Sequence, residues 1–222
     1  MDQRLESLTR ITMRPLGSPL PLGFLAFGTG VLLLTAYEAH WIPYSEQRVV
    51  AALALGFVVP LEALASVFGF LARDTAGGTT MGLFAASWVG NALFLLLTPP
   101  DTPSHALAFL QAAIAVAALV LAIAALAAKP FFSLILLVAS ARFALSCAHQ
   151  LGVTGLESIA TGLGLALAAM SVYGALALLI EDGRGRTVLP LFRPGKARQA
   201  IEADLDAQLR DISHEPGVRL QL

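Results

Sequence analysis

The sequence predicts an all-α, polytopic membrane protein with six transmembrane helices. Of its residues 57% are hydrophobic and only 13% are charged, and the mean hydropathy is +0.75; soluble globular domains are more polar and more highly charged. The stretch from Ser158 to Ile180 contains no charged residue. At about 1.5 Å per residue, a helix of this length crosses the hydrocarbon core of a bilayer. A backbone in lipid must satisfy its own hydrogen bonds, so we expect this stretch to be a helix that ends before Glu181.

Five further apolar spans precede this stretch, and prolines mark several of their boundaries. Pro19 and Pro21 stand at the entrance of the first span, where prolines suit the first turn of a helix. Pro60 lies within the second span and predicts a kink there. The connections are short, so spans that follow one another should be antiparallel neighbours. The five spans cover about residues 22–37, 49–72, 80–98, 105–128 and 131–151.

The 14 lysines and arginines are distributed unevenly along the chain. Three lie in the N-terminal arm, seven in the C-terminal tail and one each at Arg73 and Lys129, which places 12 on one side of the membrane. The other side has only Arg48, and Arg142 lies within a span. Basic residues concentrate on the cytoplasmic side, so both termini are predicted to be cytoplasmic. The chain then divides into a cytoplasmic arm (1–21), a membrane domain (22–180) and a cytoplasmic tail (181–222).

Small residues are dense in the first and sixth spans. In lipid such residues let helix backbones approach closely. The same residues can instead line a narrow pore or a subunit contact, and we favour helix packing over pore lining. The positions concerned are Gly23, Gly28, Gly30, Ala160, Gly164 and Ala168.

The tail contains an amphipathic pattern between Lys196 and Ile212, where apolar residues recur at helical spacing. We expect one cytosolic helix there. It can dock on the bundle or on a second tail, or it can stay solvated without a partner.

The chain contains no hydrolase, kinase, dinucleotide-binding or metal-binding motif. Its single cysteine, Cys147, lies in an apolar run, which excludes a disulfide within the chain and a thiol-rich metal site. Segment 183–186 reads Gly-Arg-Gly-Arg and lacks both the lysine and the preceding strand of a phosphate-binding loop. No lysine lies within a span, which excludes a retinal Schiff base. We therefore predict a protein that is not an enzyme and has no cofactor, no metal and no nucleic-acid partner.

Two ionisable residues are predicted at membrane depth, where charges are costly and often functional. Arg142 lies about 17 Å above the cytoplasmic end of its span at the helical rise, and Glu62 lies about 10 Å above that face. An arginine can bridge the difference of about 7 Å by extending along the bundle. The favoured interpretation is a buried Arg142–Glu62 pair. The alternative makes Arg142 a counter-charge for a passing carboxylate.

Four further ionisable residues lie near the outer ends of spans: Glu38, His40, His149 and Glu157. They can form an outer vestibule in which two histidines respond to pH near 6. The alternative, which we favour, places them in the lipid headgroup region.

Three short motifs at the helix ends, Ser-Pro-Leu-Pro-Leu-Gly-Phe at 18–24, Phe-Phe-Ser-Leu at 131–134 and Gly-Arg-Thr-Val-Leu-Pro at 185–190, together resemble those of the acetate uptake transporter family, the succinate–acetate permease group. Segment 18–24 is similar to the family's opening Asn-Pro-Ala-Pro-Leu-Gly-Leu. Segment 131–134 is similar to the start of its fifth helix, and segment 185–190 is similar to the motif after its sixth. The matched motif positions are Ser18, Pro19, Pro21, Gly23, Gly185, Arg186, Thr187 and Pro190.

By this resemblance, the protein is expected to be a homo-hexamer in a bacterial inner membrane. Each subunit would then hold a pore for acetate or succinate, moved through a channel or together with protons. The family pore narrows at a phenylalanine, a leucine and a tyrosine. Phe27 and Leu134 match the first two, and the tyrosine position falls at Val89, beside Trp88. Such an apolar constriction bars hydrated ions but lets a small weak acid cross when it is neutral or briefly dehydrated.

The chain also departs from the family pattern. Thr35 replaces the asparagine of helix one, Ala65 replaces a glutamine of helix two, and Arg142 stands where a small apolar residue is expected. The candidate residues for the pore or substrate are Thr35, Asn91, Tyr173, Arg142 and Glu62.

The sequence therefore predicts a membrane transporter or channel for small monocarboxylates such as acetate, and by resemblance also for succinate, with proton linkage. The first alternative is a channel for a small neutral solute, namely an amide, urea or ammonia. The second is a membrane scaffold or sensor with the same fold, in which the tail helix reports to a partner.

Overall fold

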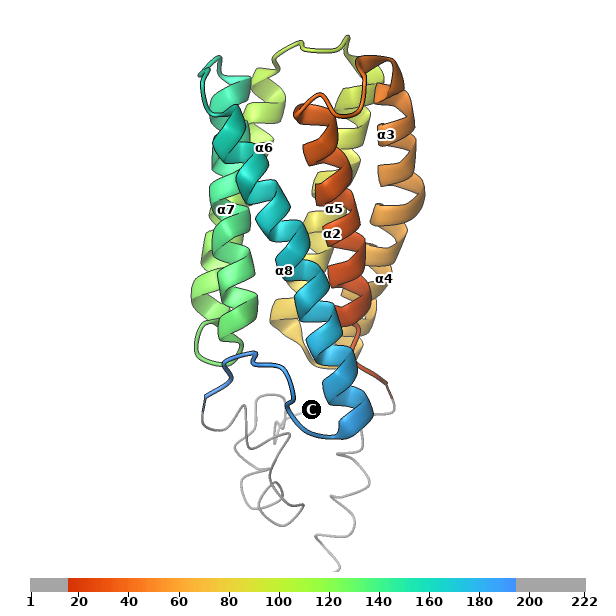
Figure 1. The fold of residues 1–222 in the computed structure, drawn as a ribbon, viewed down its shortest axis with the longest axis vertical. Coiled ribbons are helices and arrows are strands. Elements are labelled where there is room, and N and C mark those ends of the chain that lie inside the picture. Colours follow the sequence, from red (N-terminus) through yellow and green to blue (C-terminus); the bar gives the residue numbers. More distant parts are fainter. Residues whose placement is uncertain (1–15, 195–222) are drawn as a thin grey trace, which may run out of the picture.

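The computed structural model of the chain describes residues 16–194, and the amphipathic helix predicted in the tail lies outside the described residues. The described part contains six helices that are long and apolar enough to cross a membrane. They stand side by side in one elongated bundle (Figure 1). The predicted all-α fold with six spans is therefore confirmed.

The observed ends of the spans differ from the predicted ones by at most five residues. The largest differences are at the starts of the second and third spans, which begin earlier than predicted. The helices are α2 (Leu20–Glu38), α3 (Gln47–Leu53), α4 (Val59–Leu71), α5 (Thr75–Leu97), α6 (His105–Ala125), α7 (Pro130–Gln150) and α8 (Glu157–Arg184).

The second span is one continuous but irregular helix from Tyr44 to Leu71. It begins with a 3₁₀ turn, η1 (Tyr44–Glu46), and contains a π-helical turn, η2 (Ala54–Val58), between α3 and α4. Pro60 lies in the first turn of α4, directly after this π turn. A proline has no N–H to donate to the carbonyl four residues earlier, so the regular hydrogen-bond ladder is interrupted there. The irregularity lies where Pro60 predicted a kink.

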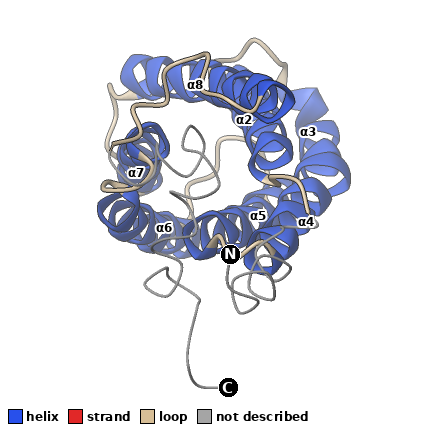
Figure 2. Cartoon of the chain, turned by 90° about the horizontal axis from the view of Figure 1, so that it is seen from below, coloured by secondary structure: helices blue, strands red, loops and turns tan. Residues whose placement is uncertain are grey.

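Viewed along the bundle, the helices form a ring (Figure 2). The second span packs between α2 and α5, and the ring continues through α6, α7 and α8 back to α2. The first and last described residues, at 16 and 194, lie at the same end of the bundle (Figure 1). We call this the inner end and the opposite end the outer end. An even number of spans explains why both ends of the described part, residues 16 and 194, lie there.

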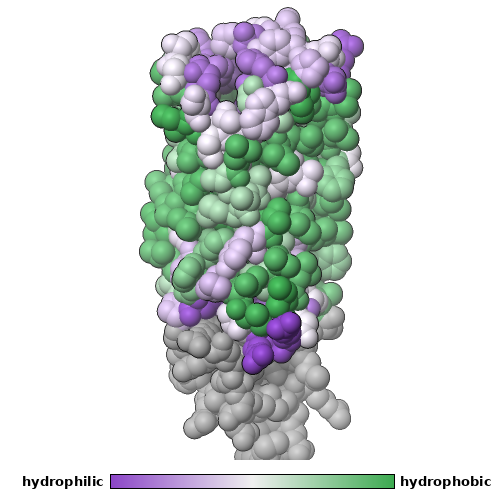
Figure 3. Space-filling view, in the orientation of Figure 1, coloured by the Kyte–Doolittle hydropathy of each residue, from purple (hydrophilic) through white to green (hydrophobic). Residues whose placement is uncertain are grey.

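The surface of the bundle has an apolar middle and two polar ends (Figure 3). Large side chains such as Phe109, Val120 and Ile123 are exposed along the helices. In water so much exposed apolar surface would be unfavourable, whereas the hydrocarbon core of a bilayer accommodates it. This apolar middle, which we call the apolar belt, is therefore the lipid-facing part of an integral membrane protein.

Small residues bring α2 and α8 into close contact. A Cβ atom on Gly28 would lie 3.0 Å from the Ser171 Cβ, and one on Gly164 would collide with Thr35. Both glycines are therefore required for the close approach of two backbones, as is common between membrane helices. For Gly28 and Gly164 the structure favours packing over pore lining.

Candidate functional site

The bundle has a cavity at each end. The outer vestibule has a volume of about 500 Å³ and is lined by residues of all six spans. The inner vestibule has a volume of about 550 Å³ and lies between the inner ends of α2, α7 and α8 and the loop between α4 and α5. No described residue lines both vestibules, which lie at opposite ends of the bundle.

Arg142 of α7 lies at the base of the outer vestibule and is buried. Its guanidinium donates to Ser146 Oγ at 2.6 Å and forms an ion pair with Glu38 of α2. The predicted pairing of Arg142 with Glu62 is therefore wrong. Glu38 keeps 39% of its side chain exposed. An ion pair at the edge of a polar vestibule loses less hydration than a pair in the apolar interior, which explains the choice of partner.

Glu62 of α4 is instead bonded to a tryptophan. It is 0% exposed, and its Oε1 accepts a hydrogen bond of 3.0 Å from Trp88 Nε1. The Trp88 indole packs against Gly30 of α2, where a Cβ would lie 2.7 Å from Cζ2. Glu62, Trp88 and Gly30 thus join three spans that are neighbours in the ring. They line neither of the two vestibules.

A second polar group at the base of the outer vestibule consists of Asn91 and Gln111. Asn91 Nδ2 donates to Ser87 O at 2.9 Å, and Gln111 Nε2 donates to Asn91 Oδ1 at 2.9 Å. Gln111 Oε1 is buried and has no hydrogen-bond partner in the described structure. Asn91 was a predicted pore candidate and does line the vestibule.

The rim of the outer vestibule includes all four ionisable residues that the sequence placed at the outer helix ends. The His40 ring contacts Tyr44 edge-on, with 5.0 Å between ring centroids. Glu157 Oε1 accepts from the Gly155 N–H at 3.2 Å. The vestibule interpretation of these residues therefore fits the geometry better than scattered positions among lipid headgroups.

Between the two vestibules, three phenylalanines meet. Phe27 of α2 stacks on Phe84 of α5, with 4.8 Å between centroids and an interplanar angle of 19°. Phe84 also contacts Phe143 of α7 at 5.8 Å. Helix α7 is not a neighbour of α2 or α5 in the ring, so the contact between Phe84 and Phe143 reaches across its interior. We call Phe27, Phe84 and Phe143 the aromatic layer. Phe24, one turn below Phe27, already lines the inner vestibule.

The other residues predicted at the constriction are placed elsewhere. Leu134 is 47% exposed and lies on the same outward face of α7 as the exposed Leu137. Trp88 packs between α2, α4 and α5, and Val89 is only partly buried. None of the three lines either vestibule. Leu134, Val89 and Trp88 are therefore not grouped with Phe27, which stacks on Phe84 instead.

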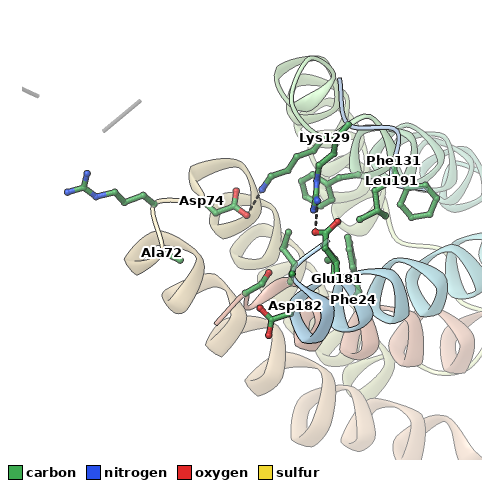
Figure 4. A pocket seen from close by; sticks show the side chains of 15 residues that line it. Phe24, Ala72, Asp74, Lys129, Phe131, Glu181, Asp182 and Leu191 are labelled. Atoms are coloured by element: carbon green, nitrogen blue, oxygen red, sulfur yellow. Dashed lines mark hydrogen bonds and ion pairs between the residues drawn. The ribbon is translucent and has the colours of Figure 1, made fainter. Parts of the chain in front are cut away.

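Two ion pairs flank the inner vestibule (Figure 4). Lys129 Nζ lies 2.5 Å from Asp74 Oδ2, and the same carboxylate caps α5 by accepting from Gly77 N at 3.0 Å. Glu181 of α8 forms an ion pair with Arg193 and accepts a hydrogen bond of 3.1 Å from Thr187 Oγ1. The inner vestibule is therefore flanked by carboxylates that are paired with basic side chains.

The segment after α8 crosses the inner end, and we call residues 185–194 the inner strap. Gly185, with φ 62°, adopts the left-handed conformation that ends α8 and turns the chain back. Tyr173 OH donates to Pro190 O at 3.0 Å, and Leu191 is buried at 6% exposure. Tyr173, a predicted pore candidate, thus anchors the strap. The strap includes the motif positions Gly185, Arg186, Thr187 and Pro190.

The remaining predicted residues have structural positions. Thr35 is fully buried between α2 and α8 and lines neither vestibule. Pro19 and Pro21 occupy the start of α2, and Gly23 faces Met81 closely enough to exclude a Cβ. Ser18 lines the inner vestibule. Among the described residues, no group of three or more His, Cys, Asp and Glu side chains is placed to hold a metal ion.

Three groups at the site were missed from the sequence: Phe84, Phe143 and Gln111. The helical period offered a signal for the first. Asn91 was assigned to the pore, and Phe84 lies seven residues earlier, hence on the same face about two turns below. Gln111 had a simpler signal, since it is a polar residue within a long apolar span.

Known proteins resemble this chain in sequence and in fold. A sequence model of the GPR1/FUN34/yaaH family matches residues 4–193, which confirms the resemblance found in the motifs. The chain is 28% identical over 198 residues to an uncharacterised protein of Methanothermobacter thermautotrophicus (strain Delta H), covering 78% of this chain and 90% of that protein. The structure of the bacterial acetate channel SatP superposes with a TM-score of 0.71 at 22% identity, covering 79% of this chain and 99% of that chain. At this identity the match demonstrates a shared fold.

Proposed function

Because the chain belongs to the GPR1/FUN34/yaaH family, we propose that it is a membrane channel or transporter for acetate and similar short monocarboxylates, and not an enzyme. The shared fold with an acetate channel supports this assignment. The observation that carries it is the pair of vestibules, one at each end of the bundle, separated by the aromatic layer of Phe27, Phe84 and Phe143.

The aromatic layer suits a small weak acid. A hydrated ion that enters an apolar gap loses water without receiving replacement hydrogen bonds, which is costly. Acetic acid in its neutral form loses less, and its methyl group gains contact with the rings. We therefore propose that a proton crosses together with the carboxylate. Succinate is a further proposed substrate, for which the vestibules of about 500 and 550 Å³ have room.

The proposal includes an orientation and an assembly. We propose that the inner end, with residues 16 and 194, faces the cytoplasm, because the order of the spans in the sequence assigns 12 of the 14 lysines and arginines to that side. The exposed apolar belt is compatible with lipid and with further subunits alike. A homo-hexamer in a bacterial inner membrane is the proposed assembly.

The decisive test is flux in proteoliposomes that contain the purified protein. We expect uptake of labelled acetate above that of empty vesicles, with competition by propionate. Because the neutral acid leaks through lipid on its own, the matched control is the same vesicle with a Phe27→Trp variant, in which a larger ring should tighten the aromatic layer. Acetate uptake no faster than in empty vesicles would refute the proposal.

A neutral solute is the second candidate, and one observation favours it. Arg142 is balanced by Glu38, so the base of the outer vestibule has no net charge to attract an anion. Urea or acetamide should then compete with acetate uptake. If neither competes, the carboxylate assignment stands. The third candidate, a scaffold or sensor, predicts no flux of any of these solutes.

A further inference from the structure

We propose that the base of the outer vestibule is a binding site for a short 2-hydroxy carboxylate, such as glycolate or lactate, held by Arg142 and Gln111. The inference rests on the proposed function because it names a substrate class for the same path. Both side chains line the outer vestibule and both are buried. The site is built from three features: a matching depth, an open acceptor and a displaceable counter-ion.

Arg142 and Gln111 lie at nearly the same depth. Ser140 Oγ of α7 donates to Ala115 O of α6 at 2.8 Å, which fixes the register of these antiparallel neighbours. Arg142 is two residues further toward the outer end along α7, and Gln111 is four residues further along α6. At the helical rise their depths differ by about 3 Å. Because they also lie on neighbouring helices and line the same vestibule, the proposed ligand bridges them.

Gln111 has an acceptor oxygen, Oε1, that receives no hydrogen bond from the described residues. Ser87 O is a backbone carbonyl and can only accept, so the 2.9 Å bond that it receives fixes Asn91 Nδ2 toward it. Asn91 Oδ1 then accepts from Gln111 Nε2, which leaves Gln111 Oε1 unpaired at a residue only 5% exposed. A buried acceptor without a partner is costly and rare. A hydroxyl group of a ligand supplies the missing donor.

Arg142 has a counter-ion that can move away. Its side chain is 10% exposed, whereas that of Glu38 is 39% exposed, so Glu38 can turn toward water while Arg142 stays in place. A planar guanidinium binds a carboxylate through two parallel hydrogen bonds. An incoming carboxylate thus replaces Glu38, which acts as an internal competitor for the site.

These features select among short acids. Acetate satisfies Arg142 but leaves Gln111 Oε1 unpaired. A 2-hydroxy acid has a carboxylate and a hydroxyl donor on adjacent carbons and satisfies both. A dicarboxylate would bring a second negative charge close to the displaced Glu38 and to an acceptor oxygen, which is unfavourable. The expected order of binding is 2-hydroxy acid, then unsubstituted acid, then dicarboxylate.

The test measures binding before transport, on the full-length protein in detergent, by calorimetric titration with glycolate and with acetate. We expect glycolate to bind about fivefold more tightly, as one additional neutral hydrogen bond provides. Gln111→Met should remove this preference, so that glycolate and acetate bind with equal affinity. Arg142→Gln should weaken both acids by more than about tenfold, since hydrogen bonds to a charged group are stronger. Glu38→Gln should strengthen both.

Controls and outcomes separate this site from the proposed function. Glu46→Gln changes an exposed carboxylate near the outer end that does not line the vestibule, and it should alter neither affinity. If Gln111→Met does not fold, Gln111→Leu replaces it. Equal affinities of the unmodified protein for the two acids would overturn the inference and would mean that Gln111 Oε1 pairs with water only. Acetate flux without any binding preference would then leave the proposed function intact. A glycolate preference without flux of any acid would refute the proposed function and keep the site.

Discussion

The aromatic layer predicts that truncation of Phe27 speeds the passage of solute. The Phe27 ring is 2% exposed and stacks on Phe84 at 4.8 Å, so it fills the region where the path closes. Stacked rings gain about 0.5–1.5 kcal/mol beyond their buried area. If a solute must separate this stack, Phe27→Ala removes at least that part of the barrier. Since about 1.4 kcal/mol corresponds to tenfold in rate, acetate flux should rise by roughly two- to tenfold.

The same change should relax the size limit and lower stability. Loss of a buried phenylalanine ring costs about 3–5 kcal/mol in folded cores, so the melting temperature in detergent should fall and must be measured beside flux. Butyrate should gain relatively more than acetate. Leu134→Ala is the matched control, because Leu134 is exposed on the outward face of α7. A folded Phe27→Ala variant with unchanged flux and unchanged preference for acetate over butyrate would refute the role of the layer.

Three further predictions address other parts of the structure. In a Cys147→Ser background, a cysteine in the loop at residues 99–104 should react with an impermeant reagent from outside and a cysteine in the tail should not; the reverse pattern would contradict cytoplasmic termini. Glu62→Gln should have the melting temperature of the unmodified protein, because its amide oxygen still accepts from Trp88 Nε1. Glu62→Leu should lose about 1–3 kcal/mol of stability, because it leaves the buried Trp88 N–H unpaired. Equal melting temperatures of the two variants would argue against this hydrogen bond. The double variant Arg142→Leu with Glu62→Leu should be no more stable in a thermal melt than Arg142→Leu alone, because the partner of Arg142 is Glu38. Full recovery of stability in the double variant would support the Arg142–Glu62 pair predicted from depth.

The membrane domain was predictable because the bilayer restricts the solutions. A span must be helical, apolar and of a certain length, so composition alone locates it. Pro60 identified the irregular helix, and Gly28 and Gly164 indicated close helix packing without naming the helices that meet, because each acts through local backbone chemistry. Such effects depend on neighbours along the chain, and the sequence shows those directly.

The partner of Arg142 was not predictable from depth. Glu62 and Arg142 were matched by their heights along the bundle, but the second span and α7 are not neighbours in the ring. Height is one coordinate, and the position around the ring is a second that hydropathy does not provide. The same missing coordinate explains why Leu134 was grouped with Phe27. Leu134 lies on the outward face of α7, while Phe143 of the same helix contacts Phe84.

The inner strap gives a last prediction, about what holds the inner mouth. Glu181 is buried, and its two carboxylate oxygens hold Thr187 and Arg193 on either side of the buried Leu191. Removing one member of a buried ion pair leaves the other charge uncompensated. Glu181→Gln should therefore loosen the strap, so that a cysteine placed at position 191 reacts faster with a thiol reagent added from the inner side. Asp182→Asn, an exposed neighbour on α8, is the control and should leave the rate unchanged. Equal rates in both variants would mean that Tyr173 and the apolar contacts of Leu191 hold the strap without the ion pair.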